Sequence, residues 1–436
     1  MPILGKQAEG RTNAEKANIL ANHFKNTSSN DNCTKTFLEN KKQKSPDIIA
    51  AISDPGSNTS DLNIPFTLTE YRRALKQKKS TSPGNTWGTN KKHLLKLYRV
   101  LIRSIIDYGS QVYDSASDNA LHALERIQYK ALRVALGATK NTPTVSLLAE
   151  AGEQPLQLRR NTLTLKYWAR TQGHGTQFPP NKLITQAKHT TFKKTKQHKP
   201  PYNHKIHSLL SEHNLNNIKI TQFHTNPTPP WKLVAPKTST DILHSTDKKE
   251  NPIAAKNIAL SIIHDKYKNR IQIYTDGSKN QTTDRVGLGI YAPELGIELS
   301  IRVTDKCSVY TSELIAIGLA LRIVDETKPP GGAVILTDSL SSLQSIESGH
   351  STRITEIHSI TNTLQSLHTQ NIHTTIEYIP AHVDIPGNDM ADSLAKKALD
   401  NQTILCNTTY SKEEVYSMIK KSVDKSWADT WLQVGR

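Results

Sequence analysis

The segment from Arg270 to Leu399 alternates short apolar runs with helical patterns, and this order of elements constrains the fold more than any other feature of the chain. IQIYTDGS predicts a strand that ends in a turn, and VGLGIYAPELGIELSIRV predicts a hairpin of two further strands. The rest predicts, in order, a helix, a strand, two helices, a strand and a helix. We therefore expect an α/β fold with a mixed five-stranded sheet flanked by helices.

Composition and periodicity divide the chain into five expected parts. These are a polar N-terminal segment at 1–86, a helical region at 87–175, a basic linker rich in His, Pro and Lys at 176–268, the α/β domain at 269–401 and a C-terminal helical tail at 402–436. In the helical region, apolar residues recur at three-four spacing between Lys91 and Tyr113, over Ala120–Leu136 and over Pro155–Arg170. The linker shows no sustained period, and we expect it to be mostly irregular.

The charge is distributed unevenly along these parts. The whole chain carries a formal net charge of +17, with +10 in the linker and −6 in the α/β domain. A surplus of this size predicts a polyanionic partner. Nucleic acid is favoured over a membrane surface because no amphipathic basic anchor is present. No run of 18 apolar residues exists, so no membrane span is expected.

The cysteines and the N-terminal sequence predict an intracellular, soluble protein. Cys33, Cys307 and Cys406 are too few and too scattered for a disulfide framework or a zinc cluster. The first 16 residues contain no apolar core of a secretory signal. These features favour neither the nucleus nor the cytoplasm, and they point to no particular protein partner.

Four carboxylates of the α/β domain lie where a strand ends or a helix begins. They are Asp276 in YTDGS, Glu313 in YTSELIAI, Asp338 in LTDSLSSL and Asp392 in GNDMADSLA. Ligands of open α/β sheets bind beyond the strand ends, so converging carboxylates are expected to form a site there. Four such groups raise one another's pKa unless cations neutralise them, and hard oxygen ligands select Mg²⁺ or Mn²⁺. Two such ions, about 3.5–4 Å apart, activate a water and stabilise the leaving oxygen of a phosphodiester.

Each carboxylate also has a simpler interpretation. An Asp-Gly pair forms turns, and an Asp or Ser before a helix caps it. For a single carboxylate this interpretation is the stronger one. The presence of all four in this element order favours the metal site.

Arg270–Leu399 resembles a type 1 ribonuclease H domain, the kind that cuts RNA in an RNA–DNA hybrid. The resemblance depends on YTDGS, the SEL helix start, TDS and PAHVDIPGNDMADSLA. It implies a ribonuclease H-like fold and endonucleolytic hydrolysis of the RNA strand that leaves 5′-phosphates. It also implies a cofactor of two Mg²⁺ ions, with Mn²⁺ as an alternative, and an RNA–DNA hybrid as partner.

The resemblance also implies the roles of individual residues. Asp276, Glu313, Asp338 and Asp392 match the family's four metal-binding, catalytic carboxylates, and His382 matches a mobile histidine thought to help proton transfer or product release. The alternative for His382 is an ordinary histidine of a surface loop. Asp389 competes with Asp392 for the fourth position, but alignment on Asn388 and on Leu394-Ala395 favours Asp392.

The domain departs from the family pattern in its contacts to nucleic acid. The family often has Asn or Gln just before the helix glutamate, whereas this chain has Val309-Tyr310-Thr311-Ser312. We expect hydroxyls or backbone groups to contact the hybrid there. The basic protrusion of some members is absent, because 353–371 holds one Arg and no Lys. The basic segments beside the domain are therefore expected to supply the phosphate contacts.

The N-terminal half resembles two parts of a non-LTR retrotransposon reverse transcriptase. IPFTLTEYRRALKQKKSTSPG is similar to the start of that enzyme. WGTNKKHLLKLYRVLIRSIIDYGSQVYDSAS, followed by LERIQYKALRVALGA, is similar to the helices after its polymerase palm. The two matches meet at Thr86-Trp87, and no Asp-Asp pair exists anywhere in the sequence. We therefore expect a helical remnant without polymerase activity. The alternative is an unrelated basic helical domain at 1–172.

The leading hypothesis is a retroelement-derived ribonuclease H that depends on metal ions. The alternative is a catalytically idle nucleic-acid-binding remnant, which the intact carboxylates argue against. A transposase or integrase shares the fold but normally lacks the His-x4-Gly-Asn-x3-Asp pattern.

Overall fold

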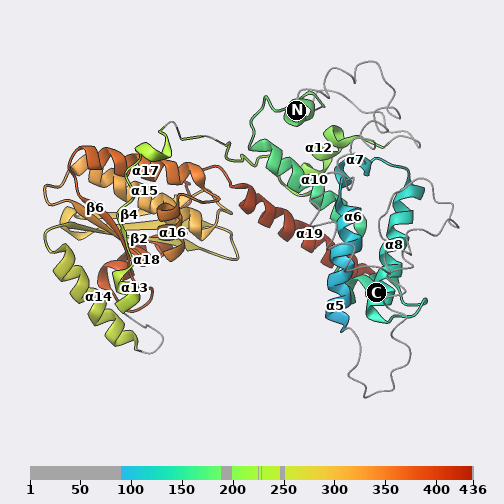
Figure 1. Ribbon diagram of the computed structural model, residues 1–436, viewed down its shortest axis with the longest axis horizontal. Coiled ribbons are helices and arrows are strands. Elements are labelled where there is room, and N and C mark those ends of the chain that lie inside the picture. The colour runs from blue at the N-terminus through green and yellow to red at the C-terminus, as the bar shows by residue number, and fades with distance from the viewer. Residues whose placement is uncertain (1–89, 188–198, 224, 227, 246–250, 435–436) are drawn as a thin grey trace, which may run out of the picture. The chain divides into compact units, whose positions relative to one another are not determined.

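The computed structural model describes residues 90–187, 199–223, 225–226, 228–245 and 251–434 (Figure 1). The polar N-terminal segment expected at 1–86 lies outside these residues, as does the Thr86-Trp87 junction.

Six strands form one mixed sheet in the order β1-β6-β5-β2-β3-β4. They are β1 (Thr238–Ser239), β2 (Ile271–Lys279), β3 (Val286–Ala292), β4 (Ile297–Val303), β5 (Ala333–Thr337) and β6 (Thr374–Tyr378). β2, β3 and β4 pair antiparallel, while β5 and then β6 extend the sheet in parallel on the other side of β2. The expected ribonuclease H-like sheet is confirmed with one strand more than predicted, because β1 from the expected linker pairs with β6.

Alternating side chains of the central strands enter two apolar cores on opposite faces of the sheet. Ile273 and Ile335 belong to one core, and Tyr274 and Leu336 belong to the other. The first face is covered by α15 (Val309–Thr327), α16 (Leu340–Ser348) and α17 (Ile354–Thr369). The second face is covered by α13 (Asp241–Ser245), α14 (Pro252–Tyr267) and α18 (Pro386–Ala398) (Figure 1).

Two glycines of β3 allow α18 to lie directly on the sheet. A Cβ at Gly289 would lie 2.0 Å from the carbonyl oxygen of Ala391, and a Cβ at Gly287 would lie 2.6 Å from that of Ala395. Any larger residue would force the helix away from the strand. This close packing holds Asp392, the next residue after Ala391, over the strands.

The region before the sheet is mostly helical, as predicted. It consists of α5 (Lys91–Leu97), the π-helix η2 (Tyr98–Arg103), α6 (Ser104–Asp107), α7 (Ser110–Tyr113), α8 (Asp118–Leu136), α9 (Thr144–Ala151) and α10 (Leu156–Gln172). The single helix expected between Lys91 and Tyr113 is interrupted by the π-helix and by Gly109, whose φ is 66°. α9 was not predicted.

The segment 176–268 is more regular than its composition indicates. Besides α13 and α14 it contains α11 (Pro179–Ala187) and α12 (Tyr202–Glu212), so the expectation of a mostly irregular linker was wrong. Ile206 and Leu209 of α12 share a core with Leu165 of α10 and with Val415 of α19 (Lys412–Val434). In α12, His and Lys residues lie between the apolar positions and obscure the helical pattern in the sequence. Among the described helices, none has the length and apolar character needed to cross a bilayer.

Candidate active site

Asp276 and Asp338 are brought together by strand register. β2 and β5 are parallel neighbours in which Thr275 is paired with Thr337, so the residue after each of these threonines lies at the same edge. β2 does not end at Asp276 as predicted. It continues to Lys279, with Asp276 opposite Gly289 in β3, so the Asp-Gly pair is part of a strand and not a turn.

Glu313 reaches the same place from the start of α15. Ser308 caps this helix by accepting a hydrogen bond from the backbone N–H of Thr311 at 3.2 Å. Glu313 Oε1 in turn accepts a hydrogen bond from the backbone N–H of Gly277 at 3.1 Å. This contact joins the helix to β2 directly beside Asp276.

Carboxylate oxygens of Asp276, Glu313 and Asp338 all lie within 4.8 Å of one another. Asp276 and Glu313 are 7% and 5% exposed. Burial, and then the charges of Asp338 and Asp392, raise the pKa of Asp276 to about 7. Burial and the neighbouring Asp276 and Asp338 raise the pKa of Glu313 well above its usual range. The cluster is therefore electrostatically unfavourable when all its members are ionised.

This donor set fits a hard divalent cation. The ligands are carboxylate oxygens, which Mg²⁺ and Mn²⁺ prefer. Glu313 Oε2 is buried and, within the described residues, has no hydrogen-bond partner. A buried carboxylate oxygen without a donor is costly, and a cation beside it would remove that cost.

Asp392 lies next to this group, on α18. Its charge is among the main causes of the raised pKa of Asp276, while its own Oδ2 accepts a hydrogen bond from Lys396 Nζ at 2.6 Å. Asp389 lies one turn earlier and is exposed. Burial, and then the charges of Asp384 and Asp392, raise the pKa of Asp389. These neighbours place Asp392, and not Asp389, closer to the carboxylate group.

His382 lies on the exposed loop between β6 and α18, with a left-handed φ of 57°. Among the smaller influences on the pKa of Asp389, the charge of His382 lowers it, so His382 lies near the start of α18. Lys396 was not singled out from the sequence. The i,i+4 spacing of Asp392 and Lys396 on a helix could have indicated their ion pair.

The start of α15 offers fewer hydroxyls to a ligand than expected. Thr311 and Ser312 are fully buried, and the Ser312 hydroxyl donates to the carbonyl of Val309 at 2.7 Å. The hydroxyls of Tyr310 and Ser351 lie 2.6 Å apart, within hydrogen-bond distance. Val309 is the exposed side chain of this stretch, at 37%. Side-chain hydroxyls of Thr311 and Ser312 are therefore not available for contacts to nucleic acid.

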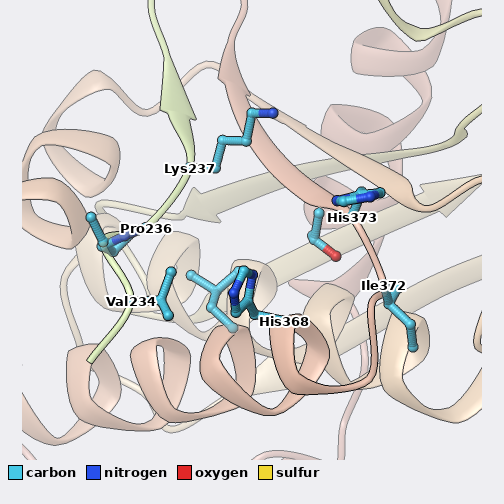
Figure 2. A pocket seen from close by; sticks show the side chains of 9 residues that line it. Val234, Pro236, Lys237, His368, Ile372 and His373 are labelled. Carbon is cyan, nitrogen blue, oxygen red and sulfur yellow. The ribbon is translucent and has the colours of Figure 1, made fainter. Parts of the chain in front are cut away.

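A separate pocket of about 70 Å³ lies between residues 234–237 and the end of α17 (Figure 2). Figure 2 shows His368 and His373 among its lining side chains, together with Val234 and Ile372. None of its lining residues is acidic. The pocket is therefore distinct from the carboxylate site.

A model of the RNase H family matches residues 268–400. A search of curated proteins gave no significant match. Among solved structures, the chain is similar to LC11-RNase H1, isolated from compost by a metagenomic approach, with 20% sequence identity, a TM-score of 0.26, and coverage of 30% of this chain and 96% of that one. The family match spans the strands from β2 to β6 and all four carboxylates, and it identifies residues 268–400 as an RNase H domain.

Proposed function

We propose that this domain hydrolyses the RNA strand of RNA–DNA hybrids, with divalent ions held by Asp276, Glu313, Asp338 and Asp392. The observation that carries the proposal is the buried group Asp276, Glu313 and Asp338, whose oxygens lie within 4.8 Å of one another. A purely structural role does not explain why a fold would bury carboxylates that repel one another. Two bound Mg²⁺ ions, or Mn²⁺ in their place, would supply an activated water and stabilise the leaving oxygen.

The residues of the chain itself have three tasks in this reaction. The strand and helix contacts at Gly277 keep Asp276 and Glu313 in place before any ligand binds. Asp392, held by Lys396, is positioned to complete the ligand set from α18. His382, on its exposed loop, is placed to carry a proton or to assist product release.

Recognition of the hybrid depends on its shape more than on its sequence. The 2′-hydroxyls of the RNA strand lie in a wide, shallow minor groove and distinguish RNA from DNA. Because the Thr311 and Ser312 side chains are buried, we assign contacts at the start of α15 to the backbone and to Val309. Phosphate contacts come from the basic segments beside the domain, where 176–268 carries a net charge of +10.

We also propose that the whole chain derives from a retroelement. The support is the resemblance of its N-terminal half to both sides of a reverse transcriptase palm, together with the absence of an Asp-Asp pair from the sequence. In this interpretation the nuclease domain persisted after the polymerase was lost.

The test is cleavage of a hybrid labelled on the RNA strand by the full chain, with Mg²⁺ and with a chelator. Cleavage that requires Mg²⁺ and yields 5′-phosphates is expected. Binding of the hybrid without any cleavage would support the idle remnant instead.

A further inference from the structure

We propose that Glu414, at the start of α19, is a positioning residue for Glu313, and that the active site therefore includes chain beyond residue 400. This inference rests on the proposed function, because it takes Glu313 to be a metal ligand. Glu414 lies 14 residues after the end of the range that the family model matches. It is 8% exposed, although it is a glutamate on a largely polar helix.

One oxygen of Glu414 closes the N-terminus of α15. Its Oε1 accepts hydrogen bonds from the backbone N–H of Ser308 at 2.7 Å, from the Ser308 hydroxyl at 3.0 Å and from the Thr311 hydroxyl at 2.6 Å. In a capping box, a Glu three residues after the N-cap bonds the N-cap N–H. Here that third position is Thr311, and the carboxylate comes from more than 100 residues later in the chain.

The second oxygen fixes Glu414 itself. Its Oε2 accepts from the backbone N–H of Ser411 at 2.8 Å and lies 3.5 Å from Arg353 Nη1. Arg353 is only 1% exposed and also donates to the Thr409 carbonyl at 2.6 Å and the Thr408 hydroxyl at 2.8 Å. Because these hydrogen bonds fix the guanidinium of Arg353, the Glu414 carboxylate beside it is held in one orientation.

Glu414 is ionised in this setting. Burial alone would raise the pKa of its carboxyl, but hydrogen bonds from Thr311 and Ser308 and the charge of Arg353 lower it. An anion at a helix N-terminus is also stabilised by the helix dipole. The carboxylate is therefore a permanent acceptor for the first turn of α15.

Glu313 lies on the same helix, two residues after Thr311, so the contacts of Glu414 also fix the position of Glu313. Burial, and then the charges of Asp276 and Asp338, oppose the ionised form of Glu313. Gly277 holds Glu313 at the strand side, and Glu414 holds the preceding residues of the helix at the other side. Without the second anchor, the first turn of α15 would be free to shift, and the carboxylates would lose their common geometry.

The experiment compares full-chain Glu414→Gln and Glu414→Ala with Glu413→Gln, a matched change at the neighbouring, 42% exposed glutamate. Three quantities are measured: Mn²⁺ affinity by electron paramagnetic resonance without nucleic acid, kcat and KM on a labelled hybrid, and thermal unfolding. Loss of a partner that orients a metal ligand typically weakens binding or activity 10- to 100-fold, so we expect Mn²⁺ affinity and kcat to fall roughly tenfold in Glu414→Gln and further in Glu414→Ala. KM for the hybrid and all values for Glu413→Gln should stay near wild type.

A folded Glu414→Gln variant with unchanged Mn²⁺ affinity and kcat would overturn the inference and leave Glu414 a stability residue. Faster cleavage by that variant would also overturn it, because Glu414 would then restrain the site. If both Glu414 variants fail to fold, Thr311→Val removes one donor to Glu414 and should weaken Mn²⁺ binding in the same direction. The two proposals can fail separately. If the wild-type chain cuts no hybrid but Glu414→Gln binds Mn²⁺ more weakly than wild type, the proposed nuclease activity is refuted and the positioning role of Glu414 is retained. A wild-type chain that binds no Mn²⁺ would refute both.

Discussion

The backbone N–H of Gly277 lies 3.1 Å from Oε1 of Glu313 and joins the strand of Asp276 to the helix of Glu313. A Cβ at Gly277 would lie 2.4 Å from the Ser312 hydroxyl and 3.1 Å from the Glu313 backbone nitrogen. The glycine is therefore needed for the close approach of α15, and this approach brings together two carboxylates that repel each other.

Gly277→Ala should separate α15 from β2 and remove most hybrid cleavage. Overpacking of this kind costs about 1–3 kcal/mol in the free energy of unfolding. Cleavage assays and thermal unfolding of the full chain would measure both effects. Gly318→Ala, in α15 itself, is the control, because its Cβ would meet only Ile360 Cγ1 at 3.8 Å. That variant should cleave normally and gain about 0.5–1 kcal/mol of stability, and equal activity of the two variants would contradict the packing argument.

Asp276→Asn should leave the fold intact and lower hybrid cleavage by several orders of magnitude. The change removes one charged ligand with little change in volume, at the centre of the carboxylate group. Asp389→Asn is the control, because Asp389 is exposed and is expected to take no part in binding metal. If Asp389→Asn abolishes cleavage while Asp392→Asn does not, the choice of the fourth ligand is wrong.

Without divalent ions, the domain should lose stability as the pH rises from about 4 to about 7. Burial, followed by the charges of Asp338 and Asp392, raises the pKa of Asp276 from 3.8 to about 7, so this carboxyl binds more protons in the folded protein than in the unfolded chain in this window. The free energy of unfolding then falls with rising pH. Thermal unfolding in a chelator at pH 5 and pH 8 would show the loss, and Mg²⁺ should reverse it at pH 8. A pH dependence in Asp276→Asn as steep as in wild type would assign the effect to other groups.

The sequence predicted the parts of the site that depend on local pattern. Asp276 and Asp338 each follow a run of strand residues, IQIYT and AVILT, and carboxylates in such positions were expected to converge at one edge of the sheet. Glu313 could be placed because YTSELIAI has the pattern of a helix start, and α15 begins at Val309, four residues before Glu313.

What the sequence did not predict depends on contacts between distant segments. β1 has only two residues, and its strand character comes from pairing with β6. The apolar residues of α14, among them Ala255, Ala259 and Ile263, are dispersed among polar residues in the sequence. They are recognisable as core residues only because α14 packs on the sheet. In the sequence, Glu414 cannot be distinguished from a surface glutamate, because its partners Ser308 and Thr311 lie more than 100 residues earlier in the chain.

Binding of the hybrid should fall steeply with salt, and exposed lysines of 176–268 should account for part of the slope. The variant that tests this carries Gln in place of three of them, Lys219, Lys232 and Lys237. For each lysine that binds a phosphate, its replacement should reduce the slope of log K against log salt by about 0.7–0.9. The measurement is a titration of the hybrid at several salt concentrations. All variants carry Asp276→Asn as well, so that the hybrid is not cleaved during the measurement.

The control for this titration removes three exposed lysines elsewhere in the chain. They are Lys130, Lys140 and Lys328. If both triple variants change the slope equally, the effect comes from total charge and not from the linker. No change in either would mean that other segments bind the phosphates.

The chain should not synthesise DNA. Nucleotide addition requires metal ions held by palm aspartates, with the primer end and the incoming triphosphate aligned between them. Under the proposed retroelement origin, the segments assigned to the two sides of such a palm meet at Thr86-Trp87, which leaves no length for the intervening strands. No adjacent aspartates occur in the sequence. In the described helical region the acidic side chains are instead used in ion pairs: Glu153 with Arg99 and Arg103, and Asp114 with Arg160.

Primer extension on an RNA template with Mg²⁺ or Mn²⁺ and all four deoxynucleotides should give no product. Extension that disappears when an aspartate of residues 1–175 is changed to Asn would show that a polymerase site exists there.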